Sequence, residues 1–516
     1  MLLRLQVFGF KNLVDFEAHF GPFTCVAGSN GVGKSNLFDA ILFLGALVDH
    51  GLADAADALR SVSHGSGDLL ELFHRVGERR TDRLRFEADM LLPGSGLDEL
   101  GESIEASSTL VRYAVEVALR SDASPCPEAG PLELISESLV PLKPADAARK
   151  HLLFPHAPKW RKSVVLRTRA LRFISTEDGP EGRIIRLHQD GRAGRLMKRI
   201  AARQPRTLLS TVQSGEYPTA MLVRREMQSW RLLQFESSAL RRPDRYTAPV
   251  HLTAEGAHLP STLHHLERRS LRGAARAESD AAPPLPSALE LLSRRLGEFV
   301  EDLRSVAVVR DEARQLLTLS FTARDGTVFP ASSLSDGALR FLALAVIELD
   351  PDGGGLCCFE CPENGVHPGR QEALLRLIQQ MCTQPESASG TGRPPLRQVI
   401  LNTHSPVIVS HCPDDAILVA ESVGEPGSPR TATGNEPVPA MHSPSGSRLQ
   451  LGCLPGTWRA RIPGQPQTAP ERLVPYLMQA SSVPGTSPGT PVAPSRPRVA
   501  DRQDFQMTLP LTPPGV

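Results

Sequence analysis

The sequence lacks an excess of charge of either sign. Lys and Arg together number 57, and Asp and Glu together also number 57, so overall charge points to no particular class of partner. It also lacks a run of 18 apolar residues, so no membrane-spanning helix and no membrane partner are expected. The first residues enter an apolar strand directly and do not resemble a secretion signal, which favours a cytoplasmic location.

Cysteine is scarce. Eight cysteines are scattered over 516 residues, which is typical of a reduced, intracellular chain. Cys358 and Cys361 form a C-x-x-C pair, but no second Cys or His pair with ligand spacing follows, so this spacing does not predict a zinc site. The sequence also lacks a sustained heptad repeat, which argues against a long coiled coil, and it shows no nuclease motif.

The most informative segment, Gly28–Ser35, matches the phosphate-binding pattern G-x-x-x-x-G-K-[ST] at every required position. An apolar strand is predicted at 23–27, and residues 36–48 have helical spacing. Glycines let the backbone wrap around phosphates, and the helix adds its positive N-terminal end. Lys34 would reach the terminal phosphates, and the Ser35 hydroxyl would bind Mg²⁺. The predicted nucleotide contacts are Gly28, Ser29, Asn30, Gly31, Val32, Gly33, Lys34, Ser35 and Asn36.

A second group of motifs lies about 300 residues later. Ser335–Gly337 precedes a segment with helical spacing, and Ser335 is a good helix N-cap. The next apolar strand ends in Glu360, a carboxylate suited to holding Mg²⁺ opposite a phosphate loop. The turn Pro362–Pro368 follows, and a further strand leads to His404 at the edge where α/β sheets bind ligands.

In this order, the motifs resemble the nucleotide-binding core of the ATP-binding-cassette superfamily, and most closely the RecF-like and SMC-like AAA-type ATPases. That group carries a signature of the Ser-x-Gly type and a Pro-Glu-Asn-Gly-x-His-Pro turn, both of which are found here. The resemblance covers residues 1–60, where Leu5–Leu13 matches the opening strand and turn, and residues 310–420. It extends more loosely to Leu240–Pro243 and Glu255–Leu259.

The resemblance implies a role for each matching residue. Gly28–Ser35 would be the Walker A loop, Glu360 the Walker B carboxylate that holds Mg²⁺, and His404 the switch histidine near the terminal phosphate. The signature would act on ATP held by a second subunit. The resemblance therefore implies ATP and Mg²⁺ as cofactors and a homodimer closed by two ATP molecules. The signature residues are Ser335, Asp336 and Gly337.

One residue departs from the family pattern. After the Walker B carboxylate the family normally has a second Glu that positions the attacking water, but this sequence has Cys361. A thiol at its ordinary pKa is a poor substitute, and loss of a general base typically costs about 10²–10⁴-fold. Three interpretations remain open: Glu363 takes over, Asp336 of a second subunit helps, or the protein binds ATP and hydrolyses it slowly. We expect slow hydrolysis, with Glu360, Glu363 and His404 as catalytic residues.

Two parts of the nucleotide site are unassigned by the sequence. The glutamine that usually couples nucleotide to the rest of such an ATPase is not identified. Contacts to adenine are equally open, with Arg4, Lys11 and Asn12 as candidates. All three lie in the opening strand and turn.

Positive charge gathers in one stretch. Between Lys143 and Arg206 there are 17 Lys or Arg against 5 Asp or Glu, a local excess of 12, and Arg167 and Arg169 lie within it. Such a stretch could supply phosphate contacts to DNA. A solvated face of an insertion is an equally weighted alternative.

We predict an α/β fold, a P-loop NTPase core resembling an ABC-ATPase head. An inserted α+β arm lobe interrupts this core, and a disordered C-terminal tail follows it. Within the lobe, strands are expected at 84–92, 109–119 and 132–140, and helices at 192–230 and 255–271. A helix at 289–303 and a hairpin of 315–322 with 327–329 follow. The predicted parts are the core halves 1–60 and 289–421, the lobe 61–288, a small element at 422–480 and the tail 481–516.

Three functions are compatible with these features. The leading one is a RecF-like ATPase that dimerises on ATP and acts on DNA, in double-strand-break repair or in anti-phage defence. The alternative is an ATP-gated dimer switch with little hydrolysis, whose output is an effector protein. The ATPase subunit of a membrane transporter is discounted, because the insertion is too long and the signature lacks the Gly-Gly-Gln form.

Overall fold

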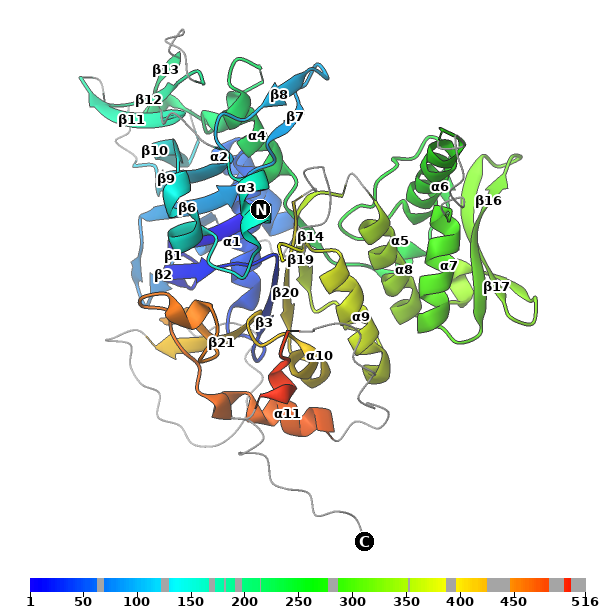
Figure 1. Ribbon diagram of the computed structural model, residues 1–516. Helices are drawn as coiled ribbons and strands as arrows, with labels where there is room; N and C mark the ends of the chain where they lie inside the picture. The colour runs from blue at the N-terminus through cyan, green and yellow to red at the C-terminus, as the bar shows by residue number, and fades with distance from the viewer. Residues whose placement is uncertain are drawn as a thin grey trace. The chain divides into compact units, whose positions relative to one another are not determined.

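The computed structural model divides the chain into two compact units (Figure 1). The first unit comprises Met1–Trp230, Thr383–Asn402 and Asp414–Ala469, and the second comprises Arg231–Cys382, Thr403–Pro413 and Pro470–Val516. The residues described are 1–62, 69–121, 130–166, 172–180, 182–190, 197–213, 215–276, 286–350, 353–386, 396–424, 446–481 and 496–502.

The first unit contains an eight-stranded antiparallel sheet. The three strands predicted in the lobe are confirmed, but the small sheet expected for them is larger, because the N-terminal strands pair with them edge to edge. In spatial order, the strands are β13 (Met197–Ile200), β12 (Gly182–Leu187), β11 (Ile174–Gly179), β10 (Leu132–Pro141), β9 (Leu110–Leu119), β6 (Arg83–Leu91), β1 (Leu2–Phe10) and β2 (Leu13–His19).

The phosphate-binding segment has the predicted strand–loop–helix order. Strand β3 (Phe23–Ala27) is buried along its whole length, as expected of a strand covered on both faces, and it leads through the loop into α1 (Lys34–Ala46). β3 pairs in parallel with β21 (Ile417–Gly424) and lies beside β20 (Arg397–Thr403). β22 (Ser447–Cys453) pairs antiparallel with β21 and belongs to the small element predicted after residue 421.

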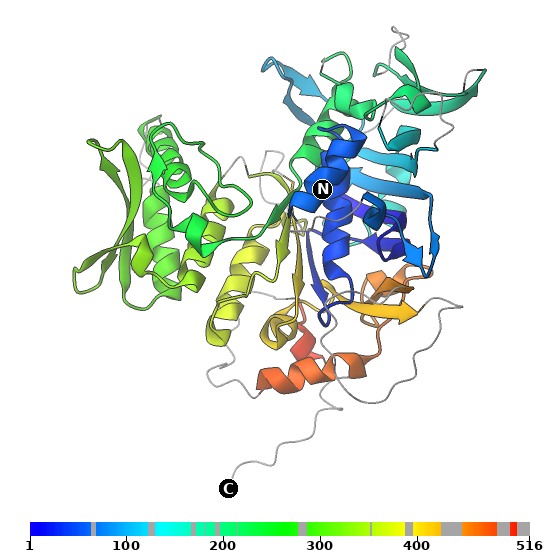
Figure 2. The same cartoon turned by 180° about the vertical axis from the view of Figure 1, so that it is seen from behind.

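The core of the first unit joins α1 to the antiparallel sheet (Figure 2). The ring of Phe43 on α1 lies 6.0 Å from that of Phe10 on β1 and 5.4 Å from that of Phe86 on β6. Such aromatic contacts add to the free energy gained by burying the rings. The helix that carries the phosphate-loop lysine is thereby fixed to the sheet. Helices α2 (Leu52–Val62) and α4 (Pro218–Gln228) pack against α1.

The first unit also contains a fully buried carboxylate, that of Glu137. Glu137 on β10 accepts hydrogen bonds from the backbone N–H groups of Leu208 and Leu209, at 2.6 and 2.9 Å, and from the Tyr113 hydroxyl at 3.2 Å. Burial nevertheless raises the pKa of Glu137 to about 7. Next to these amides, the Thr207 hydroxyl donates to the carbonyl oxygen of Leu47, just after α1. The network therefore connects β10 to the end of α1.

The remaining elements of the first unit are short. The helical region predicted at 192–230 is α-helical only in α4, because its earlier described part forms β13 and two single 3₁₀ turns. The short elements are η1 (Leu69–Leu72), β4 (Arg75–Val76), β5 (Arg79–Arg80), β7 (Ser95–Leu97), β8 (Ser103–Glu105), η3 (Pro144–Asp146), the π-helical turn η4 (Ala147–His151), α3 (Pro158–Val164), η5 (Ala201–Arg203), η6 (Leu209–Thr211) and η8 (Arg459–Arg461).

The second unit is built around a parallel strand pair and the buried helix α8. β14 (Arg231–Leu233) pairs with β19 (Gly355–Glu360), which confirms the predicted strand ending in Glu360. α8 (Asp336–Leu349) is buried over most of its length, and its Phe341 ring stacks on that of Phe299, 4.2 Å between centroids. The other helices and turns here are α5 (Ser237–Leu240), α9 (Pro368–Gln380), α10 (Pro406–His411), α11 (Val474–Ser481), η7 (Ala331–Ser333), η9 (Pro470–Arg472) and η10 (Val499–Asp501).

A second sheet of this unit packs against α6 (Leu259–Arg276) and α7 (Ala288–Phe299), as Figure 1 shows. The predicted hairpin is confirmed as β17 (Leu316–Ala323) and β18 (Val328–Pro330). The helix expected to reach residue 303 ends at Phe299, and β16 (Leu303–Asp311) pairs antiparallel with β17. β15 (Asp244–Arg245) completes the sheet.

Several predicted features lie outside the described residues. They include most of the linker at 281–286, most of the loop at 424–446 and most of the tail at 481–516. Within the tail, the described residues 496–502 include η10, where Val499 is buried and its N–H donates to Cys412 O at 3.0 Å. Among the helices described, none is long and apolar enough to cross a membrane.

Candidate functional site

The phosphate loop of the first unit has the geometry that its sequence predicts. Gly31 and Gly33 adopt positive φ angles of 79° and 100°, which glycine allows without strain. Lys34 begins α1, and its ammonium donates to the carbonyl oxygens of Gly28 and Ser29, at 2.8 and 2.7 Å. The lysine therefore lies across the loop, next to the helix N-terminus that attracts anions. The next residue, Ser35, is exposed.

Asn12 supports the loop, a role that the sequence did not reveal. Its Nδ2 donates to Val32 O at 3.1 Å, and its Oδ1 accepts from Asn36 Nδ2 at 2.8 Å. A Cβ atom on Gly33 would lie only 2.1 Å from Asn12 Nδ2, so glycine is required there for close approach as well as for its φ angle. Asn12 is buried in the turn between β1 and β2, and no local motif marks this contact.

The other two candidates for adenine recognition are held in ion pairs. Lys11 Nζ lies 2.6 Å from Asp39 on α1. Arg4 pairs with Glu17 at 2.8 Å and with Glu87 at 2.6 Å, and despite burial these carboxylates raise its pKa above the ordinary value. Recognition of adenine by Arg4, Lys11 or Asn12 stays a prediction.

In the second unit, Glu360 has a partner that the sequence analysis did not identify. Gln234 follows β14, and its Nε2 donates to Glu360 Oε2 at 2.5 Å. The parallel register that sets Leu233 opposite Phe359 carries the next residue of each strand to the same end of the pair. In the sequence, Gln234 is only a glutamine after a short segment. Its contact with Glu360 follows from the pairing of β14 with β19.

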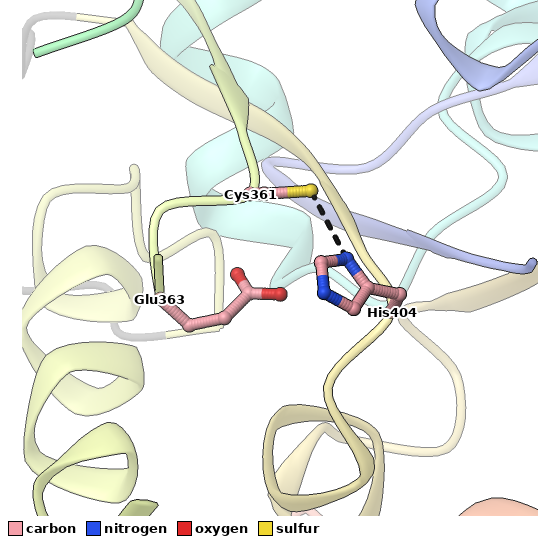
Figure 3. A group of neighbouring side chains, drawn as sticks. All are labelled: Cys361, Glu363 and His404. Atoms are coloured by element: carbon pink, nitrogen blue, oxygen red, sulfur yellow. Dashed lines mark hydrogen bonds between the residues drawn. The ribbon is translucent and has the colours of Figure 1, made fainter. Parts of the chain in front are cut away.

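Cys361, Glu363 and His404 lie together just beyond β19 (Figure 3). Cys361 Sγ is 3.4 Å from His404 Nδ1, and the carboxylate of Glu363 also faces the imidazole ring. Glu363 is only 4% exposed, and Thr403 Oγ1 donates to its Oε1 at 2.5 Å. Cys361 adopts a left-handed φ of 43°, which is uncommon for a residue with a side chain. The structure thus brings two predicted catalytic residues together with the substituted cysteine.

The predicted signature begins α8. Ser335 is the N-cap, and its Oγ accepts from the N–H of Ala338 at 3.3 Å, as predicted. Ser335 itself is exposed, whereas Gly337 is buried against the turn that carries Glu363. A Cβ atom on Gly337 would lie 2.9 Å from the carbonyl oxygen of Gly365. Glycine at position 337 therefore allows close packing of this turn on the start of α8.

Asp336 is engaged within its own chain. The Ser237 hydroxyl and the Arg241 guanidinium lower the pKa of Asp336, and Arg241 Nη2 lies 2.6 Å from its carboxylate. Arg241 also donates to the carbonyl oxygen of Leu334 at 2.8 Å. This arginine belongs to the loosely matching segment Leu240–Pro243, and the structure gives that segment a role in holding the signature.

The predicted site residues fall into two groups. The first unit carries the phosphate-loop residues 28–36, and the second carries 335–337, Glu360, Glu363 and His404. The basic stretch Lys143–Arg206 lies in the first unit, where it includes α3 and β11–β13; Arg167 and Arg169 lie outside the described residues. The C-x-x-C pair does not form a cluster, because Cys358 is fully buried in β19.

The profile of the family described as "AAA domain, putative AbiEii toxin, Type IV TA system" matches residues 206–410. This range includes the signature, Glu360 and His404, but not the phosphate loop. No curated protein matches the chain in sequence.

Among solved structures, the chain is similar to an SMC head bound to the C-winged helix domain of ScpA. The TM-score is 0.44 at 13% identity, and the match covers 88% of this chain and 98% of the other. A second is the SMC head with an extended coiled coil bound to the C-terminal domain of ScpA from Pyrococcus furiosus, with a TM-score of 0.40, 11% identity, and coverage of 88% and 96%. The SMC head domain of Thermotoga maritima has a TM-score of 0.33 at 12% identity, and the match covers 81% of this chain and 94% of the other. The family match and the strand–loop–helix order confirm the predicted resemblance at the level of an AAA-type ATPase domain, and the chain has an α/β fold in which the phosphate-binding segment lies between a buried strand and a helix.

Proposed function

We propose that this protein binds ATP with Mg²⁺, hydrolyses it slowly, dimerises on ATP and acts on DNA, in double-strand-break repair or in anti-phage defence. The observation that carries the proposal is the phosphate loop, with Lys34 lying across the carbonyls of Gly28 and Ser29 at the start of α1. In the ATP complex the lysine exchanges these carbonyls for phosphate oxygens. Ser35 and Glu360 would hold Mg²⁺.

Slow hydrolysis follows from the residues after Glu360. Cys361 replaces the expected carboxylate, and Glu363 is buried with one oxygen taken by Thr403, so it is poorly placed to orient a water molecule. Asp336, the other candidate, is paired with Arg241 in its own chain. None of the three gives the free, exposed carboxylate that a general base requires. Gln234, which contacts Glu360, is our candidate for the coupling glutamine.

Dimerisation is supported by the exposure of Ser335 at the start of α8. A helix N-terminus is suited to binding an anion, and the exposed residues at this one are Ser335 and Asp336. α8 has 14 residues and begins at Asp336, whose charge is already neutralised by Arg241. The phosphates bound there would belong to ATP on a second copy of the chain.

DNA is proposed as the partner because of the basic stretch. Its described part includes the exposed side chains of Lys198 and Arg199 on β13, the outermost strand of the eight-stranded sheet. Arg183 and Arg186 on the next strand lie within 3.7 and 2.9 Å of the acidic residues Asp178 and Glu177. The edge strand therefore carries the positive charge best suited to phosphate contacts.

The alternative function, an ATP-gated dimer switch that controls an effector protein, is favoured by Cys361. If no residue replaces the missing general base, bound ATP would hold the dimer closed without turnover. The family matched at 206–410 is described in terms of a toxin of a type IV toxin–antitoxin system, which is compatible with an output other than DNA repair.

The decisive experiment is steady-state ATP turnover of the full chain, with and without duplex DNA, together with ATP binding. Lys34→Ala serves as the blank. Turnover that increases with DNA and is abolished in Lys34→Ala supports the leading proposal. ATP binding without turnover in either condition selects the switch, and the absence of ATP binding contradicts both.

Dimerisation needs its own measurement. Molecular mass in solution, with and without ATP and Mg²⁺, is compared for the wild type and Ser335→Arg. We expect an ATP-dependent dimer for the wild type and a monomer for the variant, because an arginine side chain at the N-cap occupies the anion site. A wild type that is monomeric with bound ATP would contradict the proposed closure.

A further inference from the structure

The buried carboxylate of Glu363 has one oxygen whose surroundings the proposed ATPase function does not explain. Thr403 hydrogen-bonds to Glu363 Oε1, but no donor among the described residues hydrogen-bonds to Oε2, which is inaccessible to solvent. A buried carboxylate oxygen without a donor is costly, and such groups are normally paired or bind a cation. The carboxylate faces His404, which in turn lies beside Cys361 (Figure 3).

The three side chains have the spacing of ligands around one ion. One ligand atom from each of Cys361, Glu363 and His404 lies within 4.8 Å of the other two. Tetrahedral zinc, with bonds of about 2.3 Å to sulfur and about 2.0–2.2 Å to nitrogen and oxygen, places its ligand atoms roughly 3.4–3.6 Å apart. The Cys361 Sγ to His404 Nδ1 distance of 3.4 Å meets this value. With all separations within 4.8 Å, the carboxylate oxygen needs to move by no more than about 1.4 Å to meet it.

We propose that Cys361, Glu363 and His404 form a binding site for Zn²⁺ or a divalent ion of similar softness. One thiolate, one imidazole and one carboxylate are a donor set that favours zinc over Mg²⁺, because Mg²⁺ prefers oxygen ligands. Three protein ligands leave a fourth position for water or for a ligand oxygen. These three ligands are different residues from Ser35 and Glu360, which are proposed to hold Mg²⁺.

The surroundings hold the ligands in place. Thr403 donates to Glu363 Oε1 and thereby leaves Oε2 for the ion, in the way that outer-shell hydrogen bonds orient metal ligands. His404 follows Thr403 in the chain, so the end of β20 supplies both a ligand and this supporting hydrogen bond. The exposed His404 leaves the cluster open to ions from solvent.

Zinc binding gives Cys361 a function that hydrolysis alone does not. An ion bound here engages the proposed switch histidine and so lowers ATP turnover. That regulatory effect rests on the proposed function, whereas binding of the ion does not, because it is measured without nucleotide.

The test is a Zn²⁺ titration of the metal-free full chain without nucleotide, by calorimetry. We expect one Zn²⁺ site per chain in the wild type. In Cys361→Ser and in His404→Ala its affinity falls by more than the 10–100-fold that loss of an outer-shell partner costs. Glu363→Gln also weakens it, while leaving an oxygen to accept the hydrogen bond of Thr403. The matched control is His251→Ala, an exposed histidine of the same unit outside the cluster.

Co²⁺ provides a second readout that does not depend on affinity. Co²⁺ bound by the wild type is expected to show a thiolate-to-metal charge-transfer band that is absent in Cys361→Ser and present in His251→Ala. Thermal unfolding of each variant confirms that it is folded. The proposal is overturned if Zn²⁺ affinity is the same in the wild type and in folded Cys361→Ser, or if the Co²⁺ complex lacks the thiolate band. Neither result depends on ATP turnover.

Discussion

The phosphate loop of the first unit and the acidic segment after β19 in the second unit show opposite relations between sequence and chemistry. In the loop, every required residue is present, and the Lys34 ammonium lies across the carbonyl oxygens of Gly28 and Ser29, while its contact with phosphate stays a prediction. After β19, the first carboxylate is present in Glu360, but the next residue is a cysteine that contacts a histidine. Under the proposed function, the chain therefore keeps the residues proposed to bind phosphate and has a cysteine where the resembled family has the carboxylate that positions water. This comparison predicts that ATP binding and ATP hydrolysis can be changed separately by mutation.

Cys361→Glu should produce the largest change, because it removes this difference between the two regions. Supplying the missing carboxylate is expected to raise ATP turnover by about 10²–10⁴-fold while leaving ATP affinity nearly unchanged. Steady-state turnover is measured in zinc-free buffer with Mg²⁺. Cys361→Ser, which adds no carboxylate, is the control and should show no such increase. An unchanged rate in Cys361→Glu would mean that another residue already acts as the base.

The stability of the first unit should depend on pH because Glu137 changes its protonation state. Because its pKa rises from 4.5 to about 7 on burial, the folded protein keeps a proton there that the unfolded protein releases. This stabilisation is complete below about pH 4.5 and is lost as the pH rises through about 7. At about 1.4 kcal/mol per pKa unit, the loss is about 3 kcal/mol.

The measurement compares chemical denaturation of the wild type and Glu137→Gln between pH 5 and pH 8. The free energy of unfolding of the wild type, relative to that of Glu137→Gln, should fall as the pH rises. Glutamine has one oxygen in place of two, so the N–H of Leu208 or Leu209 loses its acceptor in the variant. The resulting change in the free energy of unfolding is an offset that does not vary with pH. A difference that is flat across this range would show that Glu137 is ionised in the fold at all of these values.

Gly33→Ala should produce the smallest change, a loss of stability of about 1–3 kcal/mol with weaker ATP binding. The new methyl group meets the Asn12 side chain, and the φ of 100° is strained for alanine. Denaturation midpoint and ATP affinity measure the two effects. Gly326→Ala, with φ of 88° and open space around the new methyl group, separates backbone strain from the clash. Equal losses in the two variants would exclude the clash with Asn12.

The features predicted correctly from the sequence are those formed by residues close together in the chain. Strand β3, the phosphate loop and α1 follow one another, so a local window of roughly 11–18 residues suffices to predict each of them. The hydrogen bond that Ser335 Oγ accepts from the Ala338 N–H spans three positions and was predicted for the same reason. The strand that ends in Glu360 is a short buried apolar segment between turns, and it was found from its composition.

Contacts between distant segments were not predictable in this way. Asn12 reaches Val32 and Asn36 across two strands, and Gln234 reaches Glu360 across 126 positions. The pairing of the N-terminal strands with the lobe strands requires the register of β1 on β6. The strand β16 has mixed polar and apolar residues, and its pairing with β17 defines it. Each of these features depends on tertiary packing and not on local propensity.

The close fit of Gly337 on Gly365 has a mechanical consequence. With no room for even a methyl group between them, the start of α8 and the turn that carries Glu363 cannot slide past each other. The exposed Ser335 and the buried Glu363 therefore belong to segments whose backbones are in direct contact, and a side chain added at position 337 would push these segments apart.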